Sequence, residues 1–153
     1  MNRGRLSLLA VSAATAAVVL TGCQKPAPGA SVFSGTHTAY SEAACWAFEA
    51  PSVDADTCAQ DVLAKAASGE AVASVTVIPG EVIGVSVDPV VADAGWNIRI
   101  GGQAITQTPL TTTYFRFTFP DLQQVPAEGL SMEIVAGTDA GTKGVWLFQL
   151  TGA

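Results

Sequence analysis

The most reactive side chains of this chain belong to three cysteines and one histidine, Cys23, His37, Cys45 and Cys58. Thiolates and imidazoles serve proteins as nucleophiles, general bases and metal ligands. A blue-copper site takes two histidines and one cysteine, so a single histidine excludes it. Cys45 and Cys58, at the spacing they have, are not accompanied by the further ligands that a zinc site requires. We therefore expect no metal site and no cofactor.

His37 lacks the sequence context of a catalytic base. It lies between two threonines in a strand-like stretch, and a serine hydrolase would need an exposed nucleophile close to it. Two stretches approach the G-x-S-x-G pattern, Gly84-Val85-Ser86 and Gly129-Leu130-Ser131, and both lack the last glycine. We interpret His37 as a surface strand residue, expect no catalytic residues, and do not expect an enzyme.

Two acidic pairs and one glycine-rich stretch could also bind ligands. Asp54 with Asp56, and Asp88 with Asp93, could each contribute to a calcium site, although neither pair resembles an EF-hand loop. Solvated aspartates in turns are the favoured interpretation of both pairs. Residues 137–143 fall one residue short of a phosphate-binding loop and precede no helix, so a hairpin loop is predicted there. The binding residues, if any, stay unassigned.

The N-terminus has the organisation of a secretory leader. Arg3 and Arg5 form a basic start, and the uncharged run Leu6–Leu20 follows. As a helix this run would span about 22 Å, less than the roughly 30 Å of bilayer hydrocarbon. Its length is typical of the apolar part of a signal peptide rather than of a transmembrane helix.

Cys23 ends that leader in the quartet Leu20-Thr21-Gly22-Cys23, which resembles the lipobox of bacterial lipoproteins. The resemblance implies that the Cys23 thiol receives a diacylglyceryl group and that cleavage occurs just before it. Acylation of the new N-terminus, for example with palmitate, would complete an anchor of two or three chains. The chain is then expected outside the cytoplasm, in the cell envelope, held to a membrane by lipid. An ordinary signal peptide cut elsewhere and a permanent signal anchor are the alternatives.

The remaining two cysteines and the charge agree with such a location. If Cys23 carries the lipid, Cys45 and Cys58 remain as an even pair, which in an exported protein usually forms a disulfide. A pair of reduced, buried thiols is the alternative. Loss of the two leader arginines changes the formal charge from −6 to −8, because all 13 acidic residues remain. An acidic body argues against nucleic acid as a partner and leaves membrane affinity to the lipid.

Past the leader, residues 24–31 are rich in proline, glycine and alanine and predict a flexible spacer. Residues 58–67 are the one convincing helix, with Thr57 as its cap and Asp61 and Lys65 one turn apart. From residue 71 onward the apolar residues alternate with a period of two, which is typical of strands. Strands are expected at 32–33, 36–46, 71–78, 81–87, 96–100, 104–107, 113–119, 130–135 and 145–150.

The alternation predicts which side chains face the core. Inward positions are Ile83, Val85 and Val87 in one strand, and Trp96, Ile98 and Ile100 in the next. The opposite parity carries Val82, Gly84 and Ser86, and later Tyr114, Arg116 and Thr118. Phe115, Phe117, Phe119, Leu130, Met132 and Ile134 are also expected inside, with Trp146 or Phe148. Trp46 adjoins Cys45 and is expected to pack on the disulfide.

These elements predict an all-β fold, an antiparallel immunoglobulin-like sandwich with one short helix. Parallel pairing is not expected, because repeated crossover helices are missing. The expected organisation is a leader at 1–22, the lipidated cysteine and spacer at 23–31, and a β-sandwich domain at 32–153. Gly101-Gly102 predicts a hairpin, whereas 88–95, 120–129 and 137–144 are expected to be loops.

The body is similar to a group of uncharacterised actinobacterial envelope lipoproteins. The likeness lies in a Gly-Trp pair after a short acidic turn, Gly95-Trp96, in a late Gly144-Val145-Trp146, and in two early cysteines. It implies an all-β fold and an envelope location. With no catalytic set in view, we expect a non-enzymatic binding or accessory module, whose partner is an envelope protein or a wall component.

A protease inhibitor is the alternative function. Chagasin-like inhibitors are similar in being small immunoglobulin-like sandwiches that present loops from one end. The loops at 88–95, 120–129 and 137–144 could serve in that way. The family's Asn-Pro-Thr-Thr-Gly loop is missing, and Asp88-Pro89-Val90-Val91 stands in its place.

Overall fold

The computed structural model describes residues 25–54, 57–58, 60–62, 64, 72–120 and 125–153, and strands dominate this part of the chain. Cys23 and residues 1–22, and with them the leader and lipidation predictions, lie outside the described residues. The elements in chain order are β1 (Gly29–Ser34), β2 (His37–Glu42), β3 (Cys45–Trp46), β4 (Ala73–Val77), β5 (Val82–Val87), α2 (Pro89–Ala94), β6 (Trp96–Ile100), β7 (Gln103–Ala104), β8 (Tyr114–Thr118), β9 (Leu130–Thr138) and β10 (Gly141–Gly152).

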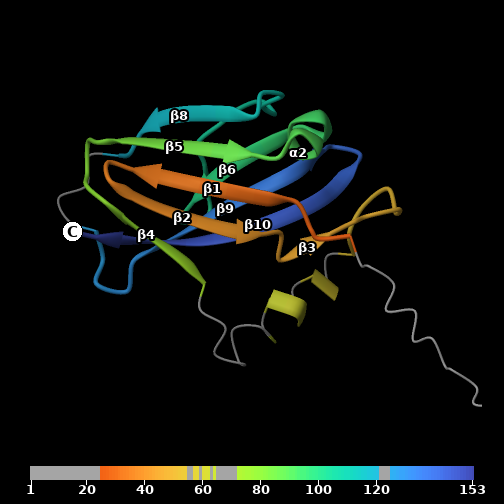
Figure 1. Ribbon diagram of the computed structural model, residues 1–153, viewed down its shortest axis with the longest axis horizontal. Coiled ribbons are helices and arrows are strands. Elements are labelled where there is room, and N and C mark those ends of the chain that lie inside the picture. Colours follow the sequence, from red (N-terminus) through yellow and green to blue (C-terminus); the bar gives the residue numbers. More distant parts are fainter. Residues whose placement is uncertain (1–24, 55–56, 59, 63, 65–71, 121–124) are drawn as a thin grey trace, which may run out of the picture.

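The strands form two sheets that face each other (Figure 1). One sheet has the order β2-β1-β5-β8, and the other has the order β3-β10-β9-β6-β7, with β4 also paired to β10. The prediction of an all-β body of two sheets is therefore confirmed. β1 begins at Gly29, three residues before the expected domain boundary at 32, so the end of the predicted spacer belongs to the sheet.

One pair of strands departs from the expected antiparallel pattern. β4 runs parallel to β10, with Ala73 opposite Phe148 and Val77 opposite Gly152. β3 uses the same edge of β10 nearer its start, pairing antiparallel at Gly144 and Val145. In the chain, β4 and β10 are separated by β5 to β9, so the other strands of the sandwich return the chain in the parallel direction and no crossover helix is needed. The expectation of purely antiparallel pairing was therefore wrong.

The core lies between the sheets and follows the predicted alternation. The inward residues of β5 and β6 are buried, as are Met132 and Ile134 in β9. Trp96, Trp146, Phe119 and Phe148 are also buried, which confirms their place in the core. Phe115 and Phe117 face inward but are only half-buried at the edge strand β8, where their rings stack 6.4 Å apart. Two buried indole N–H groups donate to carbonyls, from Trp96 to Thr112 and from Trp146 to Pro28, both at 2.8 Å.

The part of the chain that the structure describes has two helical segments, of which the sequence predicted one. The described residues between 57 and 64 are helical, as expected, but the Asp54 carboxylate rather than Thr57 supplies the cap. Lys65, the expected partner of Asp61, lies outside the described residues. The segment after Asp88, expected to be a loop, forms α2. Pro89 starts this helix with its fixed φ, Val91 and Ala92 bury its inner side, and Gly95 ends it at φ 76°.

Two of the predicted turns can be compared with the structure, and one of them is shorter than expected. Gly101 and Gly102, at φ 55° and 79°, connect β6 to β7 in the predicted hairpin. Residues 137–144 are not a loop, because β9 and β10 extend through them and leave a turn at Asp139 and Ala140. The sandwich therefore ends in a long two-stranded hairpin where a glycine-rich loop was expected.

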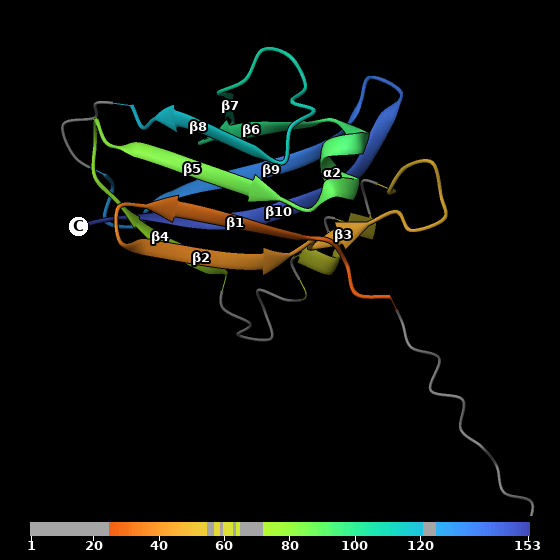
Figure 2. The same cartoon turned by 45° about the horizontal axis from the view of Figure 1, so that its top comes forward.

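The two ends of the sandwich differ in what they carry. At the entry end, where the chain enters β1, Gly29 pairs with Asp88, Gly137 donates to Gly95, and Val53 donates to Thr142. The far end holds the 79–80 turn, residues 125–129 and the C-terminus (Figure 2). α2 and the β9–β10 turn thus lie at the entry end, whereas 125–129 lie at the far end. The described parts of the three loops proposed for protease inhibition therefore do not share one end.

Candidate binding surfaces

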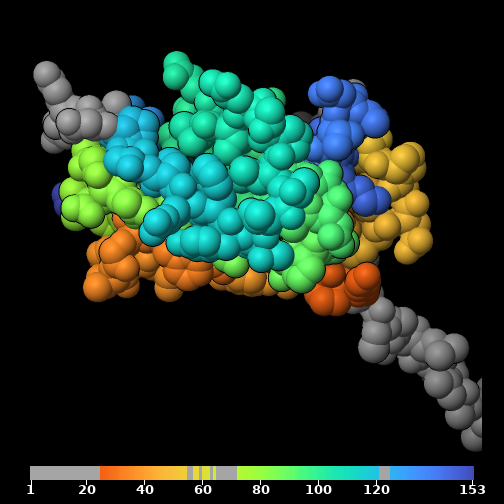
Figure 3. Space-filling view, turned by 90° about the horizontal axis from the view of Figure 1, so that it is seen from above, coloured from red at the N-terminus to blue at the C-terminus, as the bar shows by residue number. Residues whose placement is uncertain are grey.

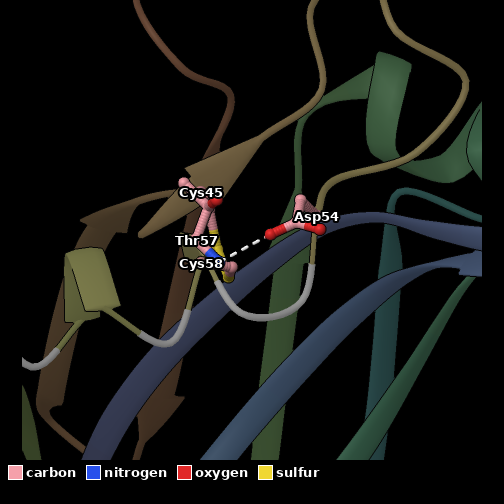
Figure 4. Close-up of a disulfide and its surroundings, with 4 residues drawn as sticks. All are labelled: Cys45, Asp54, Thr57 and Cys58. Carbon is pink, nitrogen blue, oxygen red and sulfur yellow. Dashed lines mark hydrogen bonds between the residues drawn. A yellow bond between two sulfur atoms is a disulfide. The ribbon is translucent and has the colours of Figure 1, made fainter.

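Cys45 and Cys58 form the predicted disulfide, with 5.6 Å between their Cα atoms (Figure 4). Asp54 positions Cys58, because its Oδ1 accepts the Thr57 N–H at 2.7 Å and its carbonyl accepts the Cys58 N–H at 2.9 Å. The bond ties the helical residues to β3. Closing a loop of this length stabilises the fold by about 3 kcal/mol in the chain-entropy account. Both thiols are consumed, so neither is a nucleophile.

Trp46, the last residue of β3, is half-buried beside this disulfide and packs against the neighbouring strand β10. Its ring lies 5.8 Å from that of Trp146, at 57° to it, and the Lys143 Nζ lies 5.8 Å from the Trp46 ring centre. The same ammonium donates to the Ala50 carbonyl at 2.6 Å. A side chain at Gly144 would lie 3.0 Å from the indole Cζ3, so glycine there gives the ring its space. Trp46 thus has a structural role at the entry end.

An open groove of about 490 Å³ lies over the disulfide. Ala27, Trp46, Phe48 and Asp61 are among the residues that line it. In the view from above, the β9–β10 hairpin stands beside the segment that carries the disulfide (Figure 3). Glu49, Asp54 and Asp61 bring carboxylates to its lining, and Asp54 accepts hydrogen bonds from the backbone of the disulfide segment. The lining residues named here hold β3 and the disulfide together at this end.

The members of the two acidic pairs, Asp54 with Asp56 and Asp88 with Asp93, do not act together. Asp88 Oδ2 accepts the Gly29 N–H at 2.7 Å, and the Asp88 N–H donates to the Gly29 carbonyl at 3.1 Å. This two-way contact joins the start of β1 to the start of α2. Asp93 is exposed on α2, and Asp56 lies outside the described residues. Within the described ranges, no three His, Cys, Asp or Glu residues are grouped as a metal site would need. His37 is exposed at the start of β2, as expected.

The outward surface of the sheet β2-β1-β5-β8, here called the aromatic face, is a better candidate for binding. Its positions alternate with the buried ones, and three of them are large aromatic residues, Phe33, Tyr40 and Tyr114. Their side chains are 40%, 62% and 52% exposed, respectively. Aromatic rings contribute strongly to binding because they bury large apolar areas at low entropic cost. No other described element covers these rings.

The backbone beneath the aromatic face is adapted to the two tyrosines. A methyl group on Gly29 would lie 2.8 Å from Tyr40 Cζ, and one on Gly84 would lie 2.7 Å from Tyr114 Oη. Each ring therefore lies across a glycine of the neighbouring strand, with its other side open to solvent. The sequence placed Tyr114 on an outward parity but missed Tyr40. The alternation Thr38, Tyr40, Glu42 was the signal that could have identified it.

Comparison of the chain with protein-family models, with curated protein sequences and with solved structures finds no match. Among the residues that the structure describes, no helix is long and apolar enough to cross a membrane.

Proposed function

We propose that this protein is a lipid-anchored lipoprotein of the cell envelope and acts there as a non-enzymatic binding module. Cys23 carries the lipid after cleavage of the leader, and the body lies outside the cytoplasm. The order of basic start, apolar run and Leu-Thr-Gly-Cys quartet supports the anchor. The disulfide between Cys45 and Cys58 agrees with an oxidising compartment.

The observation that carries the binding role is the aromatic face. Three exposed aromatic side chains stand on one sheet, and two of them pack closely on glycine backbone. Aromatic side chains on a hydrogen-bonded sheet have few free torsions, so they lose little conformational entropy when they bind a partner. The partner is an envelope protein or a wall component, since these are what an anchored body can reach.

The short link between anchor and body determines how that face is presented. Residues 24–28 lie between Cys23 and β1 and span at most about 20 Å. The entry end of the sandwich is then directed at the bilayer, and the aromatic face stands roughly upright from it. We also propose that the body is an immunoglobulin-like sandwich, since two facing sheets of short, mainly antiparallel strands enclose a core with two tryptophans.

The anchor is tested by expressing the chain in a bacterium supplied with labelled palmitate. Wild-type protein is expected to take up label and to sediment with membranes. Cys23→Ser is expected to lose the label and to accumulate with its leader uncut. Label on Cys23→Ser equal to that of the wild type would overturn the proposal.

The binding role is tested by sedimenting purified envelopes with the full chain in detergent. The double variant Tyr40→Ala, Tyr114→Ala is expected to remain largely in the supernatant, whereas wild type sediments. Phe48→Ala is the matched control, because Phe48 is similarly exposed, at 41%, but lies at the entry end. Equal sedimentation of the double variant and the wild type would contradict a role for the aromatic face.

A further inference from the structure

The aromatic face has an ordered arrangement across its four strands. The registers align Tyr40 with Ser31, Ser31 with Ser86, and Ser86 with Tyr114. One straight row therefore runs tyrosine, serine, serine, tyrosine across the sheet. At about 4.8 Å between strands, the two tyrosine Cα atoms are about 14 Å apart. The two rings leave the ends of this row and lean in opposite directions along the strands, over Gly29 and Gly84, so the small hydroxyl side chains of Ser31 and Ser86 lie between them.

The charge of this face differs from that of the chain as a whole. The chain has a formal charge of −6, yet the outward positions of these four strands hold only Glu42 and Arg116, whose charges cancel. A charged ligand would find no surplus of opposite charge here. Purely apolar ligands are also disfavoured, because the serine hydroxyls would lose water without gaining partners. The surface suits a ligand that is uncharged and rich in hydroxyl groups.

We propose that the aromatic face binds a neutral polysaccharide strand that runs obliquely over the sheet from the Tyr40 ring to the Tyr114 ring. Sugar rings present C–H edges with partial positive charge, which are attracted to the negative faces of Tyr40 and Tyr114. The hydroxyls of Ser31 and Ser86 donate and accept hydrogen bonds with the sugar hydroxyls between the two rings. This inference rests on the proposed function, because it names the ligand of the same face.

The size of the face favours a glycan over a second copy of the chain. Four strands about five residues long cover a flat area of roughly 300 Å². A stable protein–protein interface buries about 800 Å² of accessible surface on each partner, so a second copy would have to extend its contacts well beyond these four strands. A single extended strand of sugars needs no more than the row of rings and hydroxyls provides.

The test is gel electrophoresis of the full chain, in detergent, through gels that contain a defined polysaccharide. Neutral glucan, mannan and galactan are compared with anionic polygalacturonate. At least one neutral polymer is expected to retard the wild type, and polygalacturonate is not. Tyr40→Ala and Tyr114→Ala are each expected to weaken the retardation at least tenfold. Tyr40→Phe retains the ring and is expected to bind within threefold of the wild type.

A second variant protects the test against misfolding of the alanine variants. Ser31→Glu leaves both rings in place and puts a charge on the floor between them, so it is expected to abolish retardation by neutral polymers. Phe48→Ala, at the entry end, is expected to bind as the wild type does. Each variant must retain the wild-type melting temperature within a few degrees.

Three results would overturn the inference. They are no retardation by any neutral polymer, equal retardation of wild type and Ser31→Glu, or self-association that is lost in Tyr114→Ala. If envelopes still sediment the wild type through the aromatic face, the proposed function stands and only the ligand class is wrong. If Cys23 carries no lipid but the gels retard the wild type, the anchor is wrong and this inference stands.

Discussion

At the scale of single residues, close contacts between backbone and side chains determine which substitutions of glycine this molecule can tolerate. Gly144 lies against the ring of Trp46, and Gly29 and Gly84 lie beneath the two tyrosines of the aromatic face. At Gly144 an added methyl group would meet a half-buried ring and a backbone carbonyl, which in a densely packed region must be displaced. At Gly29 and Gly84 it would meet the exposed ends of the tyrosine rings and would push them off the sheet.

Gly144→Ala is expected to lower the free energy of unfolding by about 1–3 kcal/mol, because the new methyl group meets the Trp46 ring and the Cys45 carbonyl, the latter at 3.1 Å. Urea denaturation measures the change. In the Trp46→Ala background the same substitution is expected to cost less, since the ring is gone. An equal cost in both backgrounds would show that the ring is not the cause.

Asp88→Ala removes the carboxylate that accepts the Gly29 N–H and is expected to cost about 1–2 kcal/mol. Asp93→Ala is the matched control, since Asp93 is exposed on the same helix, and its effect is expected to stay below about 0.5 kcal/mol. Thermal unfolding of both variants gives the comparison. Similar melting temperatures for the two would contradict a structural role for Asp88.

At the scale of elements, the strands were predictable where alternation is regular. β5 and β6 bury the side chains that their period of two indicates, and β9 buries Met132 and Ile134 but leaves Leu130 half-buried at its start. The agreement follows because a strand with one buried face allows only one register. α2 was missed, since a helix of six residues is too short to show a helical period and Asp88-Pro89 is equally typical of a turn. The parallel β4–β10 pair was missed because strand alternation does not encode a partner.

The candidate site was less predictable than the core. Sequence identified the disulfide by counting cysteines, but the aromatic face joins residues from β2, β1, β5 and β8 that are far apart in the chain. Only the registers bring Tyr40, Ser31, Ser86 and Tyr114 into one row. A period of two in the sequence predicts which side chains point outward, but it does not predict which residues of the adjacent strands lie next to them.

Removal of the disulfide is expected to destabilise the connection between β3 and the helical residues. The double variant Cys45→Ala, Cys58→Ala is expected to lose about 3 kcal/mol of stability, because the unfolded chain regains the freedom of the closed loop. Urea denaturation of oxidised wild type and of the variant measures it. Binding to envelopes through the aromatic face is expected to persist, since none of its residues contacts the disulfide. Loss of that binding in a folded variant would contradict the separation of the two surfaces.

At the scale of the whole molecule, the two ends of the sandwich have different surroundings. The entry end carries the disulfide, α2 and the β9–β10 turn, and the far end carries the C-terminus (Figure 2). A lipid on Cys23 would hold the entry end near the bilayer, while the aromatic face remains exposed to the envelope.

This orientation predicts different membrane distances for two exposed turns. A fluorophore on Asp139→Cys, at the β9–β10 turn, is expected to be quenched more strongly by headgroup quenchers than one on Thr36→Cys, at the β1–β2 turn. The chain is measured in vesicles after lipidation in cells. Equal quenching at the two positions would contradict the proposed orientation.

The central claim is that a lipid on Cys23 holds this binding body at a membrane. Mass spectrometry of the N-terminal peptide from membrane-purified protein tests it most directly. The expected result is a peptide that begins at Cys23 and carries the mass of a diacylglyceryl group, with or without a further acyl chain. A mature N-terminus at another residue, or an unmodified Cys23, would contradict it.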